Sequence, residues 1–185
     1  MKSATLRSFI RSFFHALAPA STGLLGRALT LSLALLAGAS SARAWQMKQA
    51  PLMTQWAAQV DPNNVLPEYP RPQMTRTNWL NLNGVWQFQA GAVNDPVPVG
   101  KTLAGNILVP FPMESALSGV MAHYDRTWYR RTFTVPSKWK EQHVLLNFGA
   151  ADWEAQIYVN GKSVGLHQGG YDAFSYDITS YLKSS

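Results

Sequence analysis

Asp152 and Glu154 are the residues of this chain whose types and spacing come nearest to a catalytic pair. Paired carboxyl groups cleave glycosidic bonds when they stand about 5–5.5 Å apart, or about 6.5–9.5 Å apart where a water enters between them. Two residues apart on a strand, Asp152 and Glu154 would lie about 6.6 Å apart along the backbone. Both would rise from one surface instead of flanking a bond from opposite sides. We therefore predict a solvated strand edge, and no catalytic residue in this chain.

The other reactive residue types do not suggest a site either. The four histidines are scattered and show no i, i+4 spacing, and there is no cysteine, so a metal site or a disulfide is not expected. They are His15, His123, His143 and His167. The glycines at 165, 169 and 170 lack the Lys-Ser/Thr pair and the following helix of a phosphate loop. We expect no cofactor.

The stretch from Trp153 to Thr179 carries the clearest structural signal. Asn160-Gly161 separates two β-rich runs, and a two-residue turn with positive φ at both positions suits Asn-Gly best. This predicts a hairpin with arms at 154–159 and 162–167. Gly169-Gly170 should end its ladder, with an aromatic-rich loop following.

Further short strands are expected along the chain. They are Leu80 and Leu82 paired with Trp86 and Phe88 around an Asn83-Gly84 turn, then Ile107 to Val109, Trp128 to Val135, and Val144 to Phe148. Met53 to Val60 suggests a short helix, and Asp177 is placed to cap a turn or helical start. Short strands, regular turns and many aromatic residues predict an all-β antiparallel sandwich, with a jelly roll as the fitting topology.

A family resemblance emerges from motifs in a fixed order. They are Leu82-Asn83-Gly84-Val85-Trp86-Gln87-Phe88, Ile107-Leu108-Val109-Pro110, Trp128-Tyr129-Arg130-Arg131-Thr132-Phe133-Thr134-Val135-Pro136, Ile157-Tyr158-Val159-Asn160-Gly161, Gly169-Gly170-Tyr171 and Asp177-Ile178-Thr179. Together they resemble the N-terminal sugar-binding, galactose-binding-like sandwich of family 2 glycoside hydrolases, which include β-galactosidases, β-glucuronidases and β-mannosidases. The resemblance covers about residues 70–182.

The resemblance implies a non-catalytic role for this chain. In the family, both catalytic glutamates lie in a (β/α)₈ barrel far downstream, and no part of that barrel is present here. The implied partners are a β-glycoside and the catalytic barrel of a parent enzyme. Relatives continue with another strand after the motif at 177–182, so the sandwich is expected to lack its last strand or to end close to its boundary.

Five residues are candidates for sugar contact. Exposed aromatic faces pack against pyranose C–H groups, and the aromatic candidates are Trp128, Trp153, Tyr158 and Tyr171. Glu114 joins them because it lies on the loop that follows the "V-P" strand, and in some relatives that loop approaches the active site of the barrel. Each aromatic side chain has core or edge packing as its ordinary alternative role.

The first 44 residues read as a secretory signal. Basic residues come first, an uncharged Leu- and Ala-rich run spans 28–39, and Ala42-Arg43-Ala44 offers a cleavage site after Ala44. Twelve apolar residues are too few for a membrane-spanning helix, which needs about 20. We expect a periplasmic or secreted protein without a stable membrane anchor, a Pro-rich lead segment at 45–72 and the sandwich at 73–185.

Charge and composition narrow the classes of partner. Residues 1–44 hold five of the 16 basic residues and none of the 10 acidic ones, which leaves 11 basic residues and a net charge of +1. No basic stripe or nucleic-acid motif is present, so nucleic acid is disfavoured. Three readings stay open: a module of an exported family 2 glycosidase, a free-standing periplasmic carbohydrate-binding module, and a gene remnant without function.

Overall fold

The computed structural model describes residues 44–68 and 76–183. Within them the chain forms seven short strands and four single 3₁₀ turns: η1 (Ala57–Gln59), β1 (Gly84–Ala90), β2 (Gly105–Val109), η3 (Ala116–Ser118), β3 (Thr127–Arg130), η4 (Ser137–Trp139), β4 (Leu145–Phe148), β5 (Glu154–Val159), β6 (Lys162–Gln168), β7 (Phe174–Asp177) and η5 (Thr179–Tyr181). The described part is therefore all-β, as predicted. No helix in it is both long and apolar enough to span a membrane. The predicted signal peptide lies outside the described residues.

The first sheet has the order β2-β1-β3, with both pairings antiparallel. Ile107 and Leu108 are neighbours on β2, so they point to opposite faces, yet both are fully buried. This sheet is therefore covered on both sides at β2. Phe88 on β1 is also buried. Burying a side chain of this size contributes about 1.5–3 kcal/mol, so these residues hold the sheet in place.

The predicted hairpin is confirmed. β5 and β6 pair from Glu154 with Gln168 to Val159 with Lys162, and they are joined by Asn160 and Gly161. The two turn residues have φ of 50° and 82°, the positive values that a two-residue turn of this kind requires. One irregularity lies at Ile157/Tyr158, where Val164 is the extra residue of β6. The ladder ends before Gly169, as expected.

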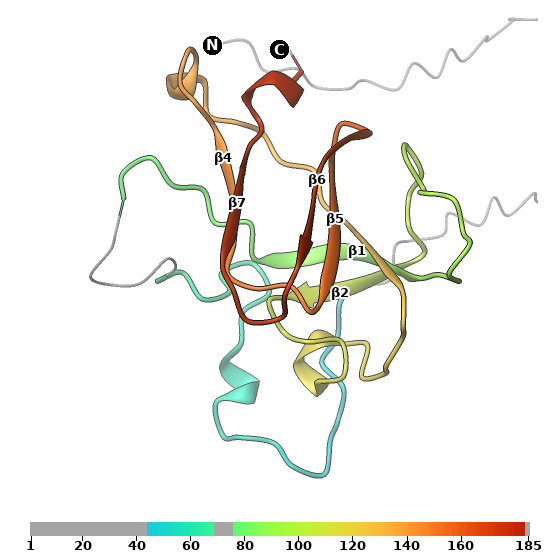
Figure 1. The fold of residues 1–185 in the computed structure, drawn as a ribbon. Coiled ribbons are helices and arrows are strands. Elements are labelled where there is room, and N and C mark those ends of the chain that lie inside the picture. Colours follow the sequence, from blue (N-terminus) through green and yellow to red (C-terminus); the bar gives the residue numbers. More distant parts are fainter. Residues whose placement is uncertain (1–43, 69–75, 184–185) are drawn as a thin grey trace, which may run out of the picture. The chain divides into compact units, whose positions relative to one another are not determined.

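The hairpin packs against a second strand pair, β4 with β7 (Figure 1). The ring of His167 on β6 stacks on Phe174 of β7 at 3.8 Å, and Phe174 stacks in turn on Phe148 of β4 at 4.7 Å. A Cβ on Gly165 would collide with the ring of Tyr176, so the two pairs approach each other as closely as glycine allows. Beneath them Val144, Val159 and Ile178 form a buried core.

The predicted strand at Leu80 and Leu82 is wrong. No strand forms there, and Gly84 begins β1 instead of turning a hairpin. The physical reason is Asn81, whose amide donates to the carbonyls of Val65 and Leu66 (both 3.1 Å) and accepts the N–H of Asn83 at 2.8 Å. A side chain that takes the hydrogen bonds of the backbone competes with a strand ladder.

Three other predicted elements differ in length or starting point: the helix over 53–60, the strand over 128–135 and the turn expected from Asp177. The helix expected over 53–60 is reduced to the single turn η1, since a short isolated helix does not offset its nucleation cost. The strand expected over 128–135 pairs only as far as Arg130, and residues 131–136 continue without a ladder. The carboxylate of Asp177 accepts the N–H of Thr179 at 2.9 Å, but the N-cap position of the turn that follows is Ile178, and its side chain makes no capping bond. That turn, η5, begins at Thr179.

Candidate binding surfaces

The loop that follows β2 folds around one buried hydroxyl. Ser118, at the end of η3, is fully buried, and its Oγ donates to the carbonyls of Met113 (3.0 Å) and Ser115 (2.7 Å). The same oxygen accepts the N–H groups of Val120 (2.9 Å) and Met121 (3.3 Å). One hydroxyl thus satisfies donors and acceptors on both sides of the loop, which fixes the backbone that carries Glu114.

Glu114 is held in a small network of charged side chains at the surface. Its Oε1 lies 2.8 Å from Nδ1 of His123, and Nε2 of His123 lies 3.5 Å from Asp125. The hydrogen bond with His123 lowers the pKa of Glu114, and the same bond raises the pKa of His123. At neutral pH the carboxylate is therefore charged, and the network favours a protonated imidazole between two acids.

Two tyrosine rings lie beside this network. Tyr124 and Tyr129 both pack on the buried ring of Phe88, with centroids 6.1 Å and 5.3 Å from it. Both tyrosines keep about two fifths of their surface exposed, at 40% and 42%. Tyr124 stands between His123 and Asp125 in the chain. Burial first, and then the negative charge of Glu114, raises the pKa of Tyr129.

The candidates Trp153 and Tyr171 come together at the open end of the hairpin. The N–H of Gly169 donates to the carbonyl of Trp153 at 2.7 Å, and the backbone of Gly170 lies against the carboxylate of Asp152. Trp153 is 61% exposed and Tyr171 is 98% exposed. Both aromatic side chains are therefore exposed to solvent on neighbouring turns.

The remaining candidates are placed elsewhere. Trp128 on β3 is partly buried, packs against Gly91 and lies under the guanidinium of Arg126 at 4.9 Å. Tyr158 is partly buried within β5, opposite Ser163. Neither joins the surface of Glu114 or the end of the hairpin through any contact in the described part of the chain.

Asp152 and Glu154 have the solvated position that the sequence predicts. Both side chains are exposed, and Glu154 accepts a hydrogen bond from Gln168 across the hairpin at 2.8 Å. Among the described residues, no three His, Cys, Asp or Glu side chains are grouped so that they could hold a metal ion.

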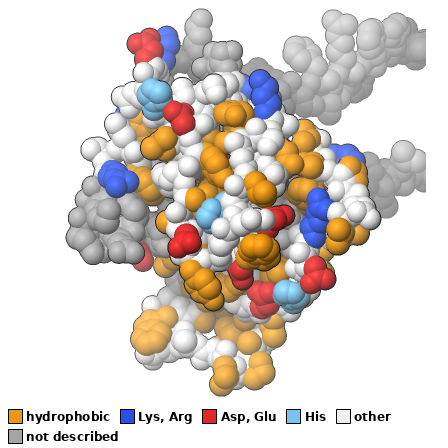
Figure 2. Space-filling view, viewed as in Figure 1, with side chains coloured by type: hydrophobic (Ala, Val, Ile, Leu, Met, Phe, Trp, Pro, Cys, Tyr) orange, Lys and Arg blue, Asp and Glu red, His pale blue; other side chains and the backbone are white. Residues whose placement is uncertain are grey.

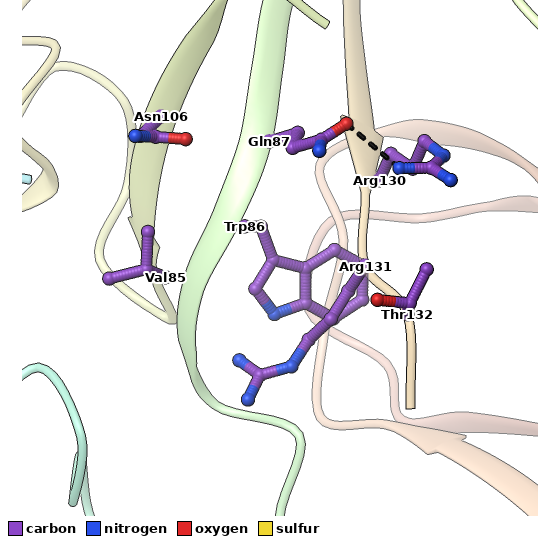
Figure 3. Close-up of a pocket in the computed structure, with 7 residues that line it drawn as sticks. All are labelled: Val85, Trp86, Gln87, Asn106, Arg130, Arg131 and Thr132. Atoms are coloured by element: carbon purple, nitrogen blue, oxygen red, sulfur yellow. Dashed lines mark hydrogen bonds between the residues drawn. The ribbon is translucent and has the colours of Figure 1, made fainter. Parts of the chain in front are cut away.

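A shallow hollow of about 250 Å³ crosses the first sheet (Figure 3). Asn106, Gln87 and Arg130 form one row across β2, β1 and β3, and Arg130 donates to Oε1 of Gln87 at 3.0 Å. Arg131 donates to the carbonyl of Asn83 at 3.1 Å, and burial lowers its pKa. Figure 3 shows the two guanidinium groups pointing in different directions, so they do not form a clamp for one anion.

Sequence reasoning identified Glu114 but missed the tyrosines and the histidine beside it. Tyr124 and Tyr129 come from the end of a loop and from β3, while their shared support, Phe88, comes from β1. That contact depends on pairing between strands distant in sequence. The alternation of side chains along the two strands could have indicated this contact, because Tyr129 of β3 lies opposite Phe88 of β1 in the strand pairing.

Residues 52–185 match the family described as "Glycosyl hydrolases family 2, sugar binding domain". The chain belongs to this family, which confirms the resemblance drawn from the motifs.

Individual relatives are enzymes much longer than this chain. A β-glucuronidase of Paenibacillus borealis is 31% identical over 122 residues, covering 60% of this chain and 20% of the enzyme. A β-galactosidase of Thermoanaerobacter pseudethanolicus is 44% identical over 57 residues, covering 31% of this chain and 8% of the enzyme. A solved β-glucuronidase of Faecalibacterium prausnitzii is 31% identical and covers 56% of this chain and 18% of that structure, with a TM-score of 0.49. The chain thus spans a fifth or less of each.

Proposed function

We propose that this chain is the non-catalytic, N-terminal sugar-binding domain of an exported family 2 glycosidase. The observation that carries the proposal is the family match over residues 52–185. The intact enzyme would hydrolyse β-linked glycosides by double displacement, using two carboxylates of a catalytic barrel. The domain would be a jelly roll that shapes the substrate pocket and packs against that barrel.

The arrangement of carboxylates supports a binding role. A retaining pair must face each other across the scissile bond at about 5–5.5 Å. Glu154 is instead tied to Gln168 on an exposed hairpin, and Glu114 is hydrogen-bonded to His123. Neither is buried among apolar side chains, the environment that raises the pKa of a general acid toward neutrality.

Export is supported by the first described residues. Ala44 directly precedes Trp45, whose indole N–H donates to the carbonyl of Ser118 at 3.0 Å. Lys48 follows with a backbone hydrogen bond to Ala116, also 3.0 Å. Cleavage after Ala44 would therefore leave the segment that docks on the loop intact. The mature chain would then be periplasmic or secreted.

Three experiments test the proposal. Sequencing the genomic region downstream should reveal a barrel with two catalytic glutamates, in frame or frameshifted, and its absence would favour a free-standing carbohydrate-binding module. The purified chain should not hydrolyse aryl β-glycosides, and turnover above background would refute the non-catalytic role. Mass spectrometry of the exported chain should give a product beginning at Trp45.

A further inference from the structure

We propose that Glu114, His123, Tyr124 and Tyr129 form a binding site for the neutral pyranose ring of a β-glycoside. The inference rests on the proposed function, because it names the residues and the class of sugar for the binding surface of that domain. The site combines two aromatic rings with a charged acceptor, the pair of features through which proteins recognise sugars.

The two tyrosines supply the apolar half of such a site. Each ring has one part packed on Phe88 and another part open to solvent. Phe88 is buried, so it holds the rings in fixed orientations. A pyranose presents a face of C–H groups that packs on an exposed aromatic ring.

Glu114 supplies the polar half. Its carboxylate accepts hydrogen bonds at two oxygens, and only Oε1 is engaged by His123. The backbone N–H of Glu114 is a second donor to this carboxylate. The lone pairs that remain can accept a sugar hydroxyl, and a hydrogen bond to a charged acceptor is stronger than one between neutral groups. His123 acts as a positioning residue, because its imidazole fixes the direction of the carboxylate.

The loop that carries Glu114 is rigid before any ligand binds. Ser118 ties together both of its sides, and the N–H of Ala122 donates to the carbonyl of Met113 at 3.2 Å, closing the loop. A ligand that meets a fixed loop does not lose affinity to ordering it. This is a reason to place the site here and not at the hairpin end, where neither Trp153 nor Tyr171 contacts another ring in the described chain.

The charge of the site selects a neutral sugar. Glu114 and Asp125 are paired only with His123, and no lysine or arginine of the described chain forms an ion pair with either. Figure 2 shows acidic side chains in the lower half of the face and also at its top, with hydrophobic and basic side chains beside the lower ones. The carboxylate of a uronic acid would be repelled here, whereas a neutral galactoside-like ring would not.

The test is an NMR titration of the purified chain with methyl β-galactoside and, separately, methyl β-glucuronide. The galactoside is expected to bind with a Kd on the order of 1 mM, as suits a ligand of its size. The glucuronide should bind about tenfold more weakly. Equal binding of the two probes would overturn the specificity, and no binding of either would overturn the site.

Matched variants locate the binding. Glu114→Gln should weaken galactoside binding and reduce the difference in Kd between the galactoside and the glucuronide. Glu141 is an exposed glutamate beyond η4, and Glu141→Gln should change neither quantity. Tyr124→Leu should abolish binding, and Tyr171→Leu should leave it unchanged. Each variant is first compared with the parent by its amide spectrum, which shows whether the fold is retained.

The opposite result for these variants would disprove the proposed site but not the assignment of the chain as a sugar-binding domain. If Tyr171→Leu removes galactoside binding and Glu114→Gln and Tyr124→Leu do not, the sugar binds at the end of the hairpin. The chain would remain a sugar-binding domain in that case. The proposed function fails separately, when the downstream sequence encodes no barrel.

Discussion

Replacing Ser118 by alanine should destabilise the protein far more than loss of one small polar side chain would suggest. The hydroxyl has one proton, shared between the carbonyls of Met113 and Ser115, and its lone pairs accept the N–H groups of Val120 and Met121. Because Ser118 is fully buried, water cannot readily take the place of Oγ. The deletion leaves several backbone groups without partners at once.

The magnitude follows from which of these groups can reach water. As a residue Met121 is 40% exposed, whereas Val120 is partly buried, so water reaches the neighbourhood of the Met121 amide more readily than that of the Val120 amide. An unsatisfied buried donor costs about 1–3 kcal/mol. We therefore expect Ser118→Ala to lower the free energy of unfolding by about 1–3 kcal/mol, with most of the loss arising from the Val120 amide and the shared carbonyls.

Urea unfolding followed by tryptophan fluorescence measures this loss, and amide exchange at Val120 and Met121 localises it. Ser137→Ala is the matched control, because Ser137 begins a 3₁₀ turn of the same length but is exposed. An exposed substitution of this kind should stay within about 0.5 kcal/mol. If the two variants lose equal stability, or if exchange at Val120 is unchanged, the reasoning about the Ser118 hydroxyl is wrong.

Three further results are expected. Gly165→Ala should cost about 1–3 kcal/mol in urea unfolding, because its Cβ would overlap the ring of Tyr176, and an unchanged midpoint would contradict that close approach. His123 should titrate above its ordinary value of 6.5 in an NMR pH series, and Glu114→Gln should lower the pKa of His123, since the hydrogen bond that His123 donates to Glu114 is the main cause of the shift. Asp177 has a pKa of about 2, chiefly through hydrogen bonds from Thr179. Its depressed pKa stabilises the fold above pH about 4, and this contribution is lost as the pH falls toward 2. Thermal unfolding of Asp177→Asn should therefore lack part of the acid-induced decrease in Tm.

The parts of the fold that were predicted correctly are those fixed by local chemistry. The hairpin follows from Asn160-Gly161, whose positive φ values need no information from elsewhere in the chain. The strand expected at Leu80 and Leu82 failed because the Asn81 side chain binds carbonyls at Val65 and Leu66. Alternation of apolar residues does not reveal such a competitor, since its acceptors lie in another segment.

The candidate site shows the same division. Residue type brought out Trp153 and Tyr171, which the structure places at adjacent turns, whereas the family resemblance brought out Glu114. The rings of Tyr124 and Tyr129 are held in place by contact with Phe88, and that contact depends on strand pairing. The sequence shows which side chains are present. Their positions, however, depend on contacts between distant segments, which no local sequence pattern reveals.

The loop of Glu114 also gives the proposed cleavage after Ala44 a testable consequence for binding. Gly119 has φ of 82°, and a Cβ there would lie 2.7 Å from the indole nitrogen of Trp45. The indole therefore occupies space that only glycine leaves open, and it donates to Ser118 on the same loop. The proposed cleavage after Ala44 would keep Trp45, whereas cleavage even one residue later would remove it and free the outer side of the loop. A chain lacking Trp45 should accordingly show faster amide exchange around Ser118 and weaker binding at Glu114, although neither residue is altered.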